Sequence, residues 1–282
     1  MMNKDFKIRR MRADELQIAI NWAAQEGWNP GIHDAETFYQ ADNNGFFIGE
    51  IGNQAVSVGS AVAYDDQFAF CGLYIVHPEY RGQGYGIALT RERLRYVGQR
   101  NAGIDGVVEN IPIYERIGYR LAYHNIRYRG IAADPASIDR RVVPLSQLPI
   151  ENIETYDRFC FPAKRHRFLY AWINQPDAKA LGLIENGQLQ GYAVRRRCIE
   201  GHKIGPLFAD NDAIADALFQ ALQQDIPGDA IYLDIMETNP VAQRLVDKYN
   251  MQVVFTTGRM YLKGQPRLDD EKIFGITTFE LG

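Results

Sequence analysis

Residues 68–92 constrain the fold of this chain more than any other stretch. They begin with an apolar, aromatic and β-branched run from Phe68 to Val76, whose composition predicts a buried strand. Pro78 ends that strand, because proline has no N–H to donate to a neighbouring strand. A glycine-rich turn follows, and apolar residues then recur at helical spacing, namely Ile87, Ala88, Leu89, Leu94 and Val97. The stretch therefore predicts a strand, a turn of bare backbone and a helix in immediate succession.

The glycine-rich turn has the physical properties of an anion site. Glycines let the main chain approach a ligand without a Cβ in the way. The first N–H groups of the helix lack intrahelical partners and lie at the positive end of the helix dipole, which suits a pyrophosphate. The spacing of Gly82, Gly84 and Gly86 does not fit the GxGxxG pattern, and no Lys-Ser/Thr pair follows as in a P-loop. An ordinary strand-to-helix turn that binds nothing is the alternative.

The same stretch resembles the acetyl-CoA pyrophosphate loop of GNAT-superfamily N-acetyltransferases. In that family, Arg/Gln-x-x-Gly-x-Gly/Ala follows a strand that ends in Val-x-Pro-x-Tyr. The matching residues here are Arg81, Gly84 and Gly86, preceded by Val76, Pro78 and Tyr80. The resemblance implies acetyl-CoA as donor and CoA as product, held by the backbone of Tyr74, Ile75 and Val76, by Arg81, and by the N–H groups of Gly82, Gln83, Gly84, Tyr85, Gly86 and Ile87.

The resemblance extends over about the first 130 residues. The order β, two helices, three strands, helix, strand, helix, strand is the one that GNAT proteins use. The second signature is Tyr-Glu-x-x-Gly-Tyr at residues 114–119, in which the family's tyrosine protonates the leaving thiolate, so the resemblance implies that Tyr114 is catalytic. The family usually has a cofactor-binding asparagine seven positions earlier. This chain has Val107 there, and Asn110 is the candidate replacement.

The second half repeats the first in weakened form. Residues 181–194 predict two strands around a turn, Lys203 to Asp210 takes the place of the central strand, and a last helix opens after Asn239. The Arg-x-x-Gly-x-Gly loop is missing, and Val246 stands where the tyrosine would be. The whole chain resembles bacterial proteins that pair an active GNAT module with an acetyltransferase-like one, in which segments such as 204–210 and 274–282 recur.

We therefore predict an α/β (α+β) protein of two tandem GNAT-like modules. Each module is a mixed, mostly antiparallel sheet flanked by helices, and the second is degenerate. The predicted boundaries are a catalytic domain at 1–130, a linker at 131–141 and a degenerate C-terminal domain at 142–282. A length of 282 residues agrees with about two domains.

Composition limits the possible partners. With 46% hydrophobic residues the chain is typical of a globular protein, and no apolar run approaches the roughly 20 residues of a membrane span. The first residues lack the apolar region of a signal peptide. A net charge of −4 argues against nucleic acid. We expect a cytoplasmic monomer or homodimer with no metal, membrane or nucleic-acid partner.

The cysteines and the two basic runs give little further evidence about function. The three cysteines, Cys71, Cys160 and Cys198, are widely spaced, which suits a reducing compartment and gives no metal-ligand pattern. The basic runs at 164–167 and 195–197 are interpreted as solvated faces, with an acidic partner or the CoA 3′-phosphate as the alternative.

The acceptor site and the base are less constrained by sequence. An alkylammonium must lose a proton before it attacks, since its pKa is about 10.4. No carboxylate lies within Phe68 to Val76, where many relatives keep a glutamate. The remaining candidates are a water chain or Glu50, Asp65, Asp66, Glu109 and His124. Trp28 and Asn29, in a turn-rich segment, are candidates to orient the substrate.

The expected function is acetyl-CoA-dependent N-acetylation. The primary amine of a small molecule, amino acid or peptide would attack acetyl-CoA directly. One alternative is a CoA-binding sensor or scaffold without turnover, suggested by Val107 and the missing strand carboxylate. A second alternative is a protein-lysine acetyltransferase, which needs an open groove.

Overall fold

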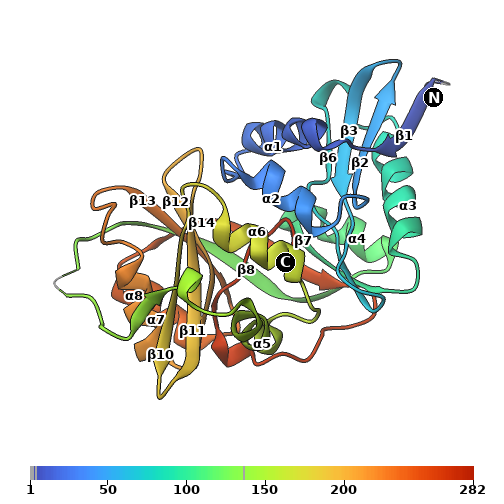
Figure 1. The fold of residues 1–282 in the computed structure, drawn as a ribbon. Helices are drawn as coiled ribbons and strands as arrows, with labels where there is room; N and C mark the ends of the chain where they lie inside the picture. The colour runs from blue at the N-terminus through green and yellow to red at the C-terminus, as the bar shows by residue number, and fades with distance from the viewer. Residues whose placement is uncertain (1–2, 4, 136) are drawn as a thin grey trace.

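The protein consists of two α/β halves packed against each other (Figure 1). A computed structural model describes residue 3, residues 5–135 and residues 137–282. Within these residues no helix is long and apolar enough to cross a membrane. The mixed sheets flanked by helices confirm the predicted α/β class.

The first half holds the elements that residues 6–131 were expected to form. Its strands and helices are β1 (Phe6–Arg10), α1 (Leu16–Gln25), α2 (Asp34–Ala41), β2 (Phe46–Ile51), β3 (Gln54–Ser60), β4 (Val62–Ala63), β5 (Phe68–Phe70), β6 (Ile75–Val76), α3 (Tyr85–Val97), β7 (Asn101–Val107), α4 (Ile111–Ile117) and β8 (Arg120–Ile131). Helix α3 begins where the glycine-rich turn predicted, and it buries Tyr85, Leu89, Arg93 and Val97, four residues apart on one face.

The second half repeats much of this order. Its elements are β9 (Val142–Pro144), α5 (Ile150–Cys160), α6 (His166–Asn174), β10 (Lys179–Glu185), β11 (Gln188–Arg197), β12 (His202–Ala209), α7 (Asp212–Ala221), β13 (Ala230–Met236), α8 (Pro240–Lys248), β14 (Gln252–Tyr261) and β15 (Ile273–Gly275). Side chains cap both α7 and α8: Asn211 accepts from the Ile214 N–H, and Asn239 accepts from the Val241 and Ala242 N–H groups.

One expected strand is broken. The sequence predicts a continuous strand from Phe68 to Val76, but β5 ends at Phe70 and β6 begins at Ile75. Leu73 lies between them with a φ of 47°, a conformation that a regular strand does not contain. Strand β5 pairs in parallel with β7, whereas β6 leaves that sheet and pairs with β3. The chain therefore splays away from β7 at this point, because β6 and β7 lie in different sheets.

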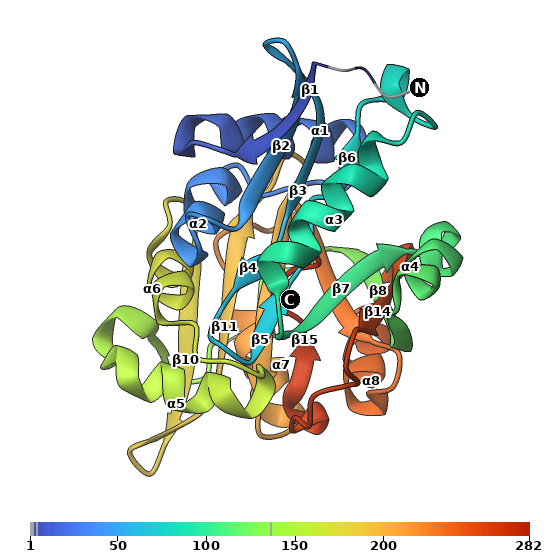
Figure 2. The same cartoon turned by 90° about the vertical axis from the view of Figure 1, so that its right-hand side faces the viewer.

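The two halves exchange strands. The large sheet runs in the order β4-β5-β7-β14-β8-β13-β12-β11-β10-β9, so β14 of the second half lies between two strands of the first. Strand β8 in turn pairs through its residues 125–131 with the whole of β13. The domain boundary at 131–141 stays a prediction. Strands of both halves belong to one continuous sheet, so the sheet does not divide there. Figure 2 shows β7, β14 and β8 side by side.

A shared core also joins the halves. Phe38 on α2 stacks on Trp172 of α6, with ring centroids 6.1 Å apart. The Arg196 guanidinium lies 4.6 Å from the Trp172 ring and pairs with Asp34, its Nε 2.9 Å from Oδ1. Both charged side chains are buried. This ion pair crosses from β11 to α2 and is enclosed by the aromatic contacts.

The interpretation of the basic runs as solvated faces is wrong at three positions. Arg165, Arg195 and Arg196 are buried, and each is paired with a carboxylate. Arg165 binds both oxygens of Asp157, at 2.6 and 2.8 Å. Arginine is the cation best suited to such sites, because its planar donors match a carboxylate two at a time.

Replacing Asp34 tests how strongly the halves are coupled. Asp34→Ala leaves the Arg196 charge buried without its partner, and we expect the free energy of unfolding to fall by about 3–5 kcal/mol. Denaturant titration followed by circular dichroism measures the change. Asp14→Ala is the control, because the Asp14–Arg12 pair is exposed on both sides, and it should cost less than about 1 kcal/mol. Equal stability of the two variants would contradict the prediction.

Candidate functional site

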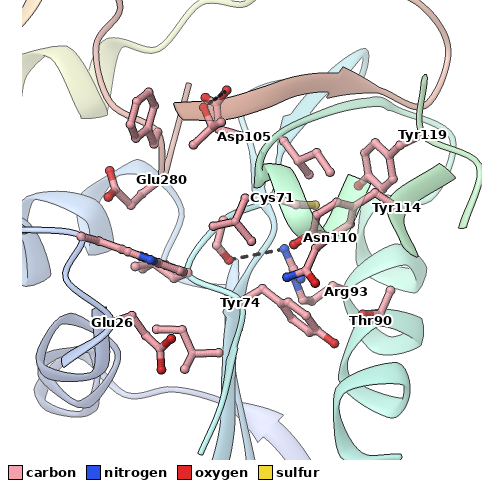
Figure 3. Close-up of a pocket in the computed structure, with 18 of the residues that line it drawn as sticks. Glu26, Cys71, Tyr74, Thr90, Arg93, Asp105, Asn110, Tyr114, Tyr119 and Glu280 are labelled. Carbon is pink, nitrogen blue, oxygen red and sulfur yellow. Dashed lines mark hydrogen bonds between the residues drawn. The ribbon is translucent and has the colours of Figure 1, made fainter. Parts of the chain in front are cut away.

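A cavity lies where β6 and β7 part. It encloses about 390 Å³ and is lined by the 71–76 segment, by α3, by the β7–α4 region and by residues of the second half. Figure 3 shows Tyr114, Tyr119 and Asn110 on one side, with Glu26 and Glu280 on the other. Five of the eleven residues that the sequence singled out for the donor line this space, namely Tyr74, Ile75, Val76, Arg81 and Asn110, whereas residues 82–87 of the glycine-rich turn do not.

The glycine-rich turn has the geometry of an open cradle. Gly82 and Gly84 have φ of 74° and 92°, which residues with a side chain rarely adopt, and a Cβ on either would meet nothing within 4 Å. Gly84 is the N-cap of α3, so the free N–H groups of the helix start there. Gly86 is close-packed, because a Cβ there would lie 2.3 Å from the Tyr74 hydroxyl oxygen. The backbone of Gly82 and Gly84 is thus uncovered, whereas Tyr74 packs against Gly86.

The side chains of this turn have different surroundings. Arg81 lines the cavity, where its Nε donates to the Val76 carbonyl at 2.9 Å and its guanidinium pairs with Glu26. Gln83 donates to the Glu79 carbonyl at 2.9 Å. Tyr85 points into the core against Phe6, and Ile87 is exposed. Only backbone groups of Gln83, Tyr85 and Ile87 are therefore candidates to hold a phosphate.

The break in the central strand is fixed by Arg93. Its Nε donates to the Ser60 carbonyl at 2.7 Å. Its Nη2 donates to the Gly72 carbonyl at 3.4 Å, and Figure 3 shows Arg93 beside the 71–74 segment. Its guanidinium also lies 5.2 Å from the Tyr74 ring. The result is an edge at β6 with free backbone groups. Because the Val76 carbonyl faces Arg81, and N–H and C=O of one strand residue point the same way, the Val76 N–H also faces away from β3.

Tyr114 lies across the cavity from this edge. Its ring packs on Gly106, where a Cβ would lie 2.3 Å from a ring carbon, and meets Tyr119 edge to face at 6.5 Å. Burial raises the pKa of the Tyr114 hydroxyl. Asn110 and Val107 both line the same space, so the proposed replacement of the family's asparagine by Asn110 is compatible with the geometry.

The candidate bases named from sequence do not line the cavity. Glu50 binds Arg9 through both oxygens, and Asp65 accepts from two N–H groups of its own turn. His124 Nδ1 lies 2.9 Å from Glu237, and neither Asp66 nor Glu109 is among the lining residues. Three other carboxylates do line the cavity: those of Glu26, Asp105 and Glu280.

The two predicted substrate residues are separated. Trp28 lines the cavity, and its carbonyl accepts from Arg127 at 2.8 Å and from Lys203 at 3.0 Å. Asn29 instead holds the second half: its side chain donates to the Glu200 carbonyl and accepts from the Glu200 N–H, both at 2.9 Å. Asn29 is not among the residues that line the cavity, so the geometry gives it a tethering contact and not a substrate contact.

Two family models match the chain. A model described as the acetyltransferase (GNAT) family matches residues 13–119, and one described as an acetyltransferase (GNAT) domain matches residues 153–275. The chain belongs to the GNAT acetyltransferases. One matched domain in each half confirms the predicted tandem arrangement, and the protein is an acyltransferase of this family.

The chain is also similar to individual proteins and, in its fold, to solved structures. A holothin acyltransferase from Pseudoalteromonas sp. (strain SANK 73390) is 29% identical over 270 residues, covering 95% of this chain and 92% of that protein. A structure assigned as an acetyltransferase from Pyrococcus horikoshii superposes with a TM-score of 0.85 at 20% identity, covering 100% and 98% of the two chains. A tandem GNAT protein from the clavulanic acid biosynthesis pathway gives a TM-score of 0.63 at 13% identity, with 91% and 98% covered.

The corresponding opening in the second GNAT module is filled by the protein's own chain. Strands β12 and β13 pair only from His202 to Ile204, and β15 then pairs with β12. Asn239 donates to the carbonyls of Asp270 and Ile273, so it holds this segment. A Cβ on Gly205 would lie 2.4 Å from the Thr277 carbonyl oxygen.

Sequence reasoning missed three groups of the GNAT site. Arg93 had a local signal, since it is a charged residue on the apolar face of α3, one turn from both Leu89 and Val97. Asp105 pairs with Arg259 of β14, and Glu280 comes from the end of the sequence, so both depend on contacts between the halves. No local sequence pattern indicates that Asp105 and Glu280 belong to the site.

Gly84→Ala tests the cradle. The new Cβ strains the backbone and projects into the open space above the turn, so we expect CoA affinity to fall by about tenfold or more, equivalent to about 1.4 kcal/mol. Isothermal titration calorimetry with CoA measures it. Gly52→Ala is matched in strain, with φ of 60° and nothing within 4 Å, and lies in the distant β2–β3 turn. Identical CoA affinity of both variants would overturn the assignment of the turn.

Proposed function

We propose that this protein is an acetyl-CoA-dependent N-acetyltransferase that acetylates a primary amine of a small molecule, amino acid or peptide. One observation carries the proposal. A single cavity is lined by Arg81, the residue at which the open glycine turn begins, by the strand edge from Tyr74 to Val76, and by the half-buried Tyr114. GNAT acyl transfer needs each of these three parts.

The donor would be held mainly by backbone. The N–H groups from Gly82 to Ile87 suit the pyrophosphate, and the free edge of Tyr74, Ile75 and Val76 suits the amide groups of the pantetheine arm, which can hydrogen-bond like an added strand. Arg81 is close enough to this edge to reach a phosphate, but Glu26 already neutralises part of its charge. Asn110 is the remaining candidate contact to the donor.

The protein's own groups supply the chemistry. The Val76 N–H faces the cavity and is the candidate donor to the thioester oxygen as negative charge develops there. The Tyr114 hydroxyl is protonated at neutral pH, since the ordinary pKa of tyrosine is about 10 and burial raises it further, and it can give its proton to the departing sulfur. Holding donor and acceptor together in the cavity contributes as well, since effective molarity alone is worth roughly 7–11 kcal/mol.

The shape of the site favours a small acceptor over a protein lysine. Phe255, Thr257 and Phe279 of the second half line the cavity opposite α3 and α4. An open groove, which a folded protein substrate requires, would need these side chains to be absent. A relative that matches nearly the whole chain is named holothin acyltransferase, which supports acyl transfer as the reaction.

An acceptor panel tests the function. Acetyl-CoA is incubated with primary amines, amino acids, short peptides and a lysine-rich protein, and CoA release is followed together with product mass. Turnover of a small amine or peptide supports the proposal. Cofactor binding without any turnover would favour the sensor alternative, and acetylation restricted to the protein would favour the lysine acetyltransferase.

Tyr114→Phe separates catalysis from binding. Loss of the proton donor should lower kcat by about 100-fold while CoA affinity changes little, since a general acid typically contributes 10²–10⁴-fold. Steady-state kinetics and calorimetry measure the two quantities. Tyr96→Phe is the control, because it removes a hydroxyl that binds Asp42 at 2.8 Å and does not line the cavity. An unchanged kcat in Tyr114→Phe would remove Tyr114 from the mechanism.

The filled opening of the second module predicts one donor site per chain. Because β15 and the Asn239 contacts occupy the space between β12 and β13, calorimetric titration with CoA should give a stoichiometry of about one. A second site of comparable affinity would show that the second module is not degenerate.

A further inference from the structure

The last seven residues, 276–282, lie buried between the two halves. All are less than a tenth exposed, and both views place the end of the chain at the centre of the molecule (Figures 1 and 2). Tyr64 of the first half donates to the Leu281 carbonyl at 2.7 Å, and Arg165 donates to the Thr277 hydroxyl at 3.0 Å. This segment, which we call the core tail, is therefore anchored by both halves.

A contact with the second half fixes where the core tail begins. The Ile276 N–H donates to the Asp234 carbonyl at 2.8 Å, so the tail leaves the filled opening beside β13. It then crosses to the break in the first half's central strand. There Gly72 is required, because a Cβ would lie 2.0 Å from the Glu280 carbonyl oxygen. Glu280 thus lies against the strand segment in which many GNAT relatives keep a glutamate and this chain has none.

Glu280 differs from the other two carboxylates of the cavity. Glu26 is paired with Arg81. Asp105 already accepts from four donor atoms, supplied by Asn125, Thr257 and the two nitrogens of Arg259. Within the described residues the Glu280 carboxylate has one donor, the Thr278 hydroxyl on Oε2. Its Oε1 is therefore free to bind a ligand in the cavity.

The cations around Glu280 have partners of their own. Arg127 lies 4.6 Å above the Phe279 ring and is bound bidentately by Asp234, and Arg196 is bound by Asp34. Lys203 donates to the Trp28 carbonyl. Burial lowers the pKa of Lys203 to about 8, and Glu280 is one of the groups that oppose this shift. These cations act on Glu280 through space and leave its Oε1 open.

We propose that Glu280, delivered by the core tail, binds the acceptor ammonium and is the general base of the acyl transfer. This inference rests on the proposed function and names the group that receives the proton. Figure 3 shows Glu280 and Tyr114 on opposite sides of the cavity, so one of them can act on the attacking nitrogen and the other on the departing sulfur. The second module then serves to carry the catalytic carboxylate of the first.

The proton balance is complete with these two residues. Glu280 takes one proton from the ammonium and later releases it to water. The amine nitrogen then forms the new C–N bond as the C–S bond breaks, and the sulfur takes the proton of Tyr114. The second proton of the nitrogen returns to Tyr114, so each turnover releases one proton.

Glu280→Gln tests the proposal, because it keeps the size of the side chain and removes its basicity. Benzylamine, which is an ammonium at neutral pH, and aniline, which is not, serve as acceptor probes. We expect kcat/KM for benzylamine to fall about 100-fold or more and that for aniline to fall by less than about fivefold. Calorimetry should show CoA affinity unchanged and benzylamine binding to the CoA-bound protein weakened. Glu271→Gln, an exposed carboxylate just before β15, is the matched control and should change nothing.

A second variant keeps the test decisive if the glutamine protein folds poorly. In Glu280→Ala the vacated space can admit formate, and sodium formate should restore benzylamine turnover in part while leaving Glu271→Ala unaffected. Wild-type turnover with an unchanged Glu280→Gln rate would overturn the role of Glu280 and leave the proposed function intact. Equal losses for both probes, or a parallel loss of CoA affinity, would show a purely structural role. No turnover of any amine by the wild type would instead refute the proposed function itself.

Discussion

The site depends on backbone N–H and C=O groups at the edge of β6 that do not pair with a neighbouring strand. A strand that stayed paired on both edges from Phe68 to Val76 would leave no hydrogen-bonding capacity for a ligand, and an unpaired buried group is costly unless something satisfies it. The protein resolves this with Arg93, which donates to the carbonyls of Ser60 and Gly72 at the break. The free edge that results is narrow, lies beside the glycine turn and opens onto a cavity instead of bulk water.

The features that the sequence predicted well are those encoded locally. The glycine-rich turn, the start of α3 and the position of Tyr114 follow from glycine, proline and aromatic residues that lie within a few positions of one another. Placing them required little knowledge of the rest of the chain. Most elements of both halves also lie where periodicity placed them. The break at Leu73 was missed because nothing in an apolar run marks where pairing switches from one sheet to another.

The errors have a common physical origin. A run such as Arg195 to Arg197 looks solvated until a carboxylate from another part of the chain is known to meet it, and Asp34 lies in the other half. Asp105 and Glu280 join the site only through strand exchange and the core tail. A single sequence reports spacing along the chain, whereas these contacts depend on register between distant strands.

The exchanged strand β14 also has a consequence for how the protein comes into existence. During synthesis β7 and β8 emerge long before the strand that fits between them, so the first half must wait with two unsatisfied sheet edges. Closing such a long loop slows folding and leaves the nascent intermediate exposed to aggregation or to a chaperone. A chain interrupted before β14 also lacks a central strand of the sheet that borders the cavity, so a truncated product would be inactive.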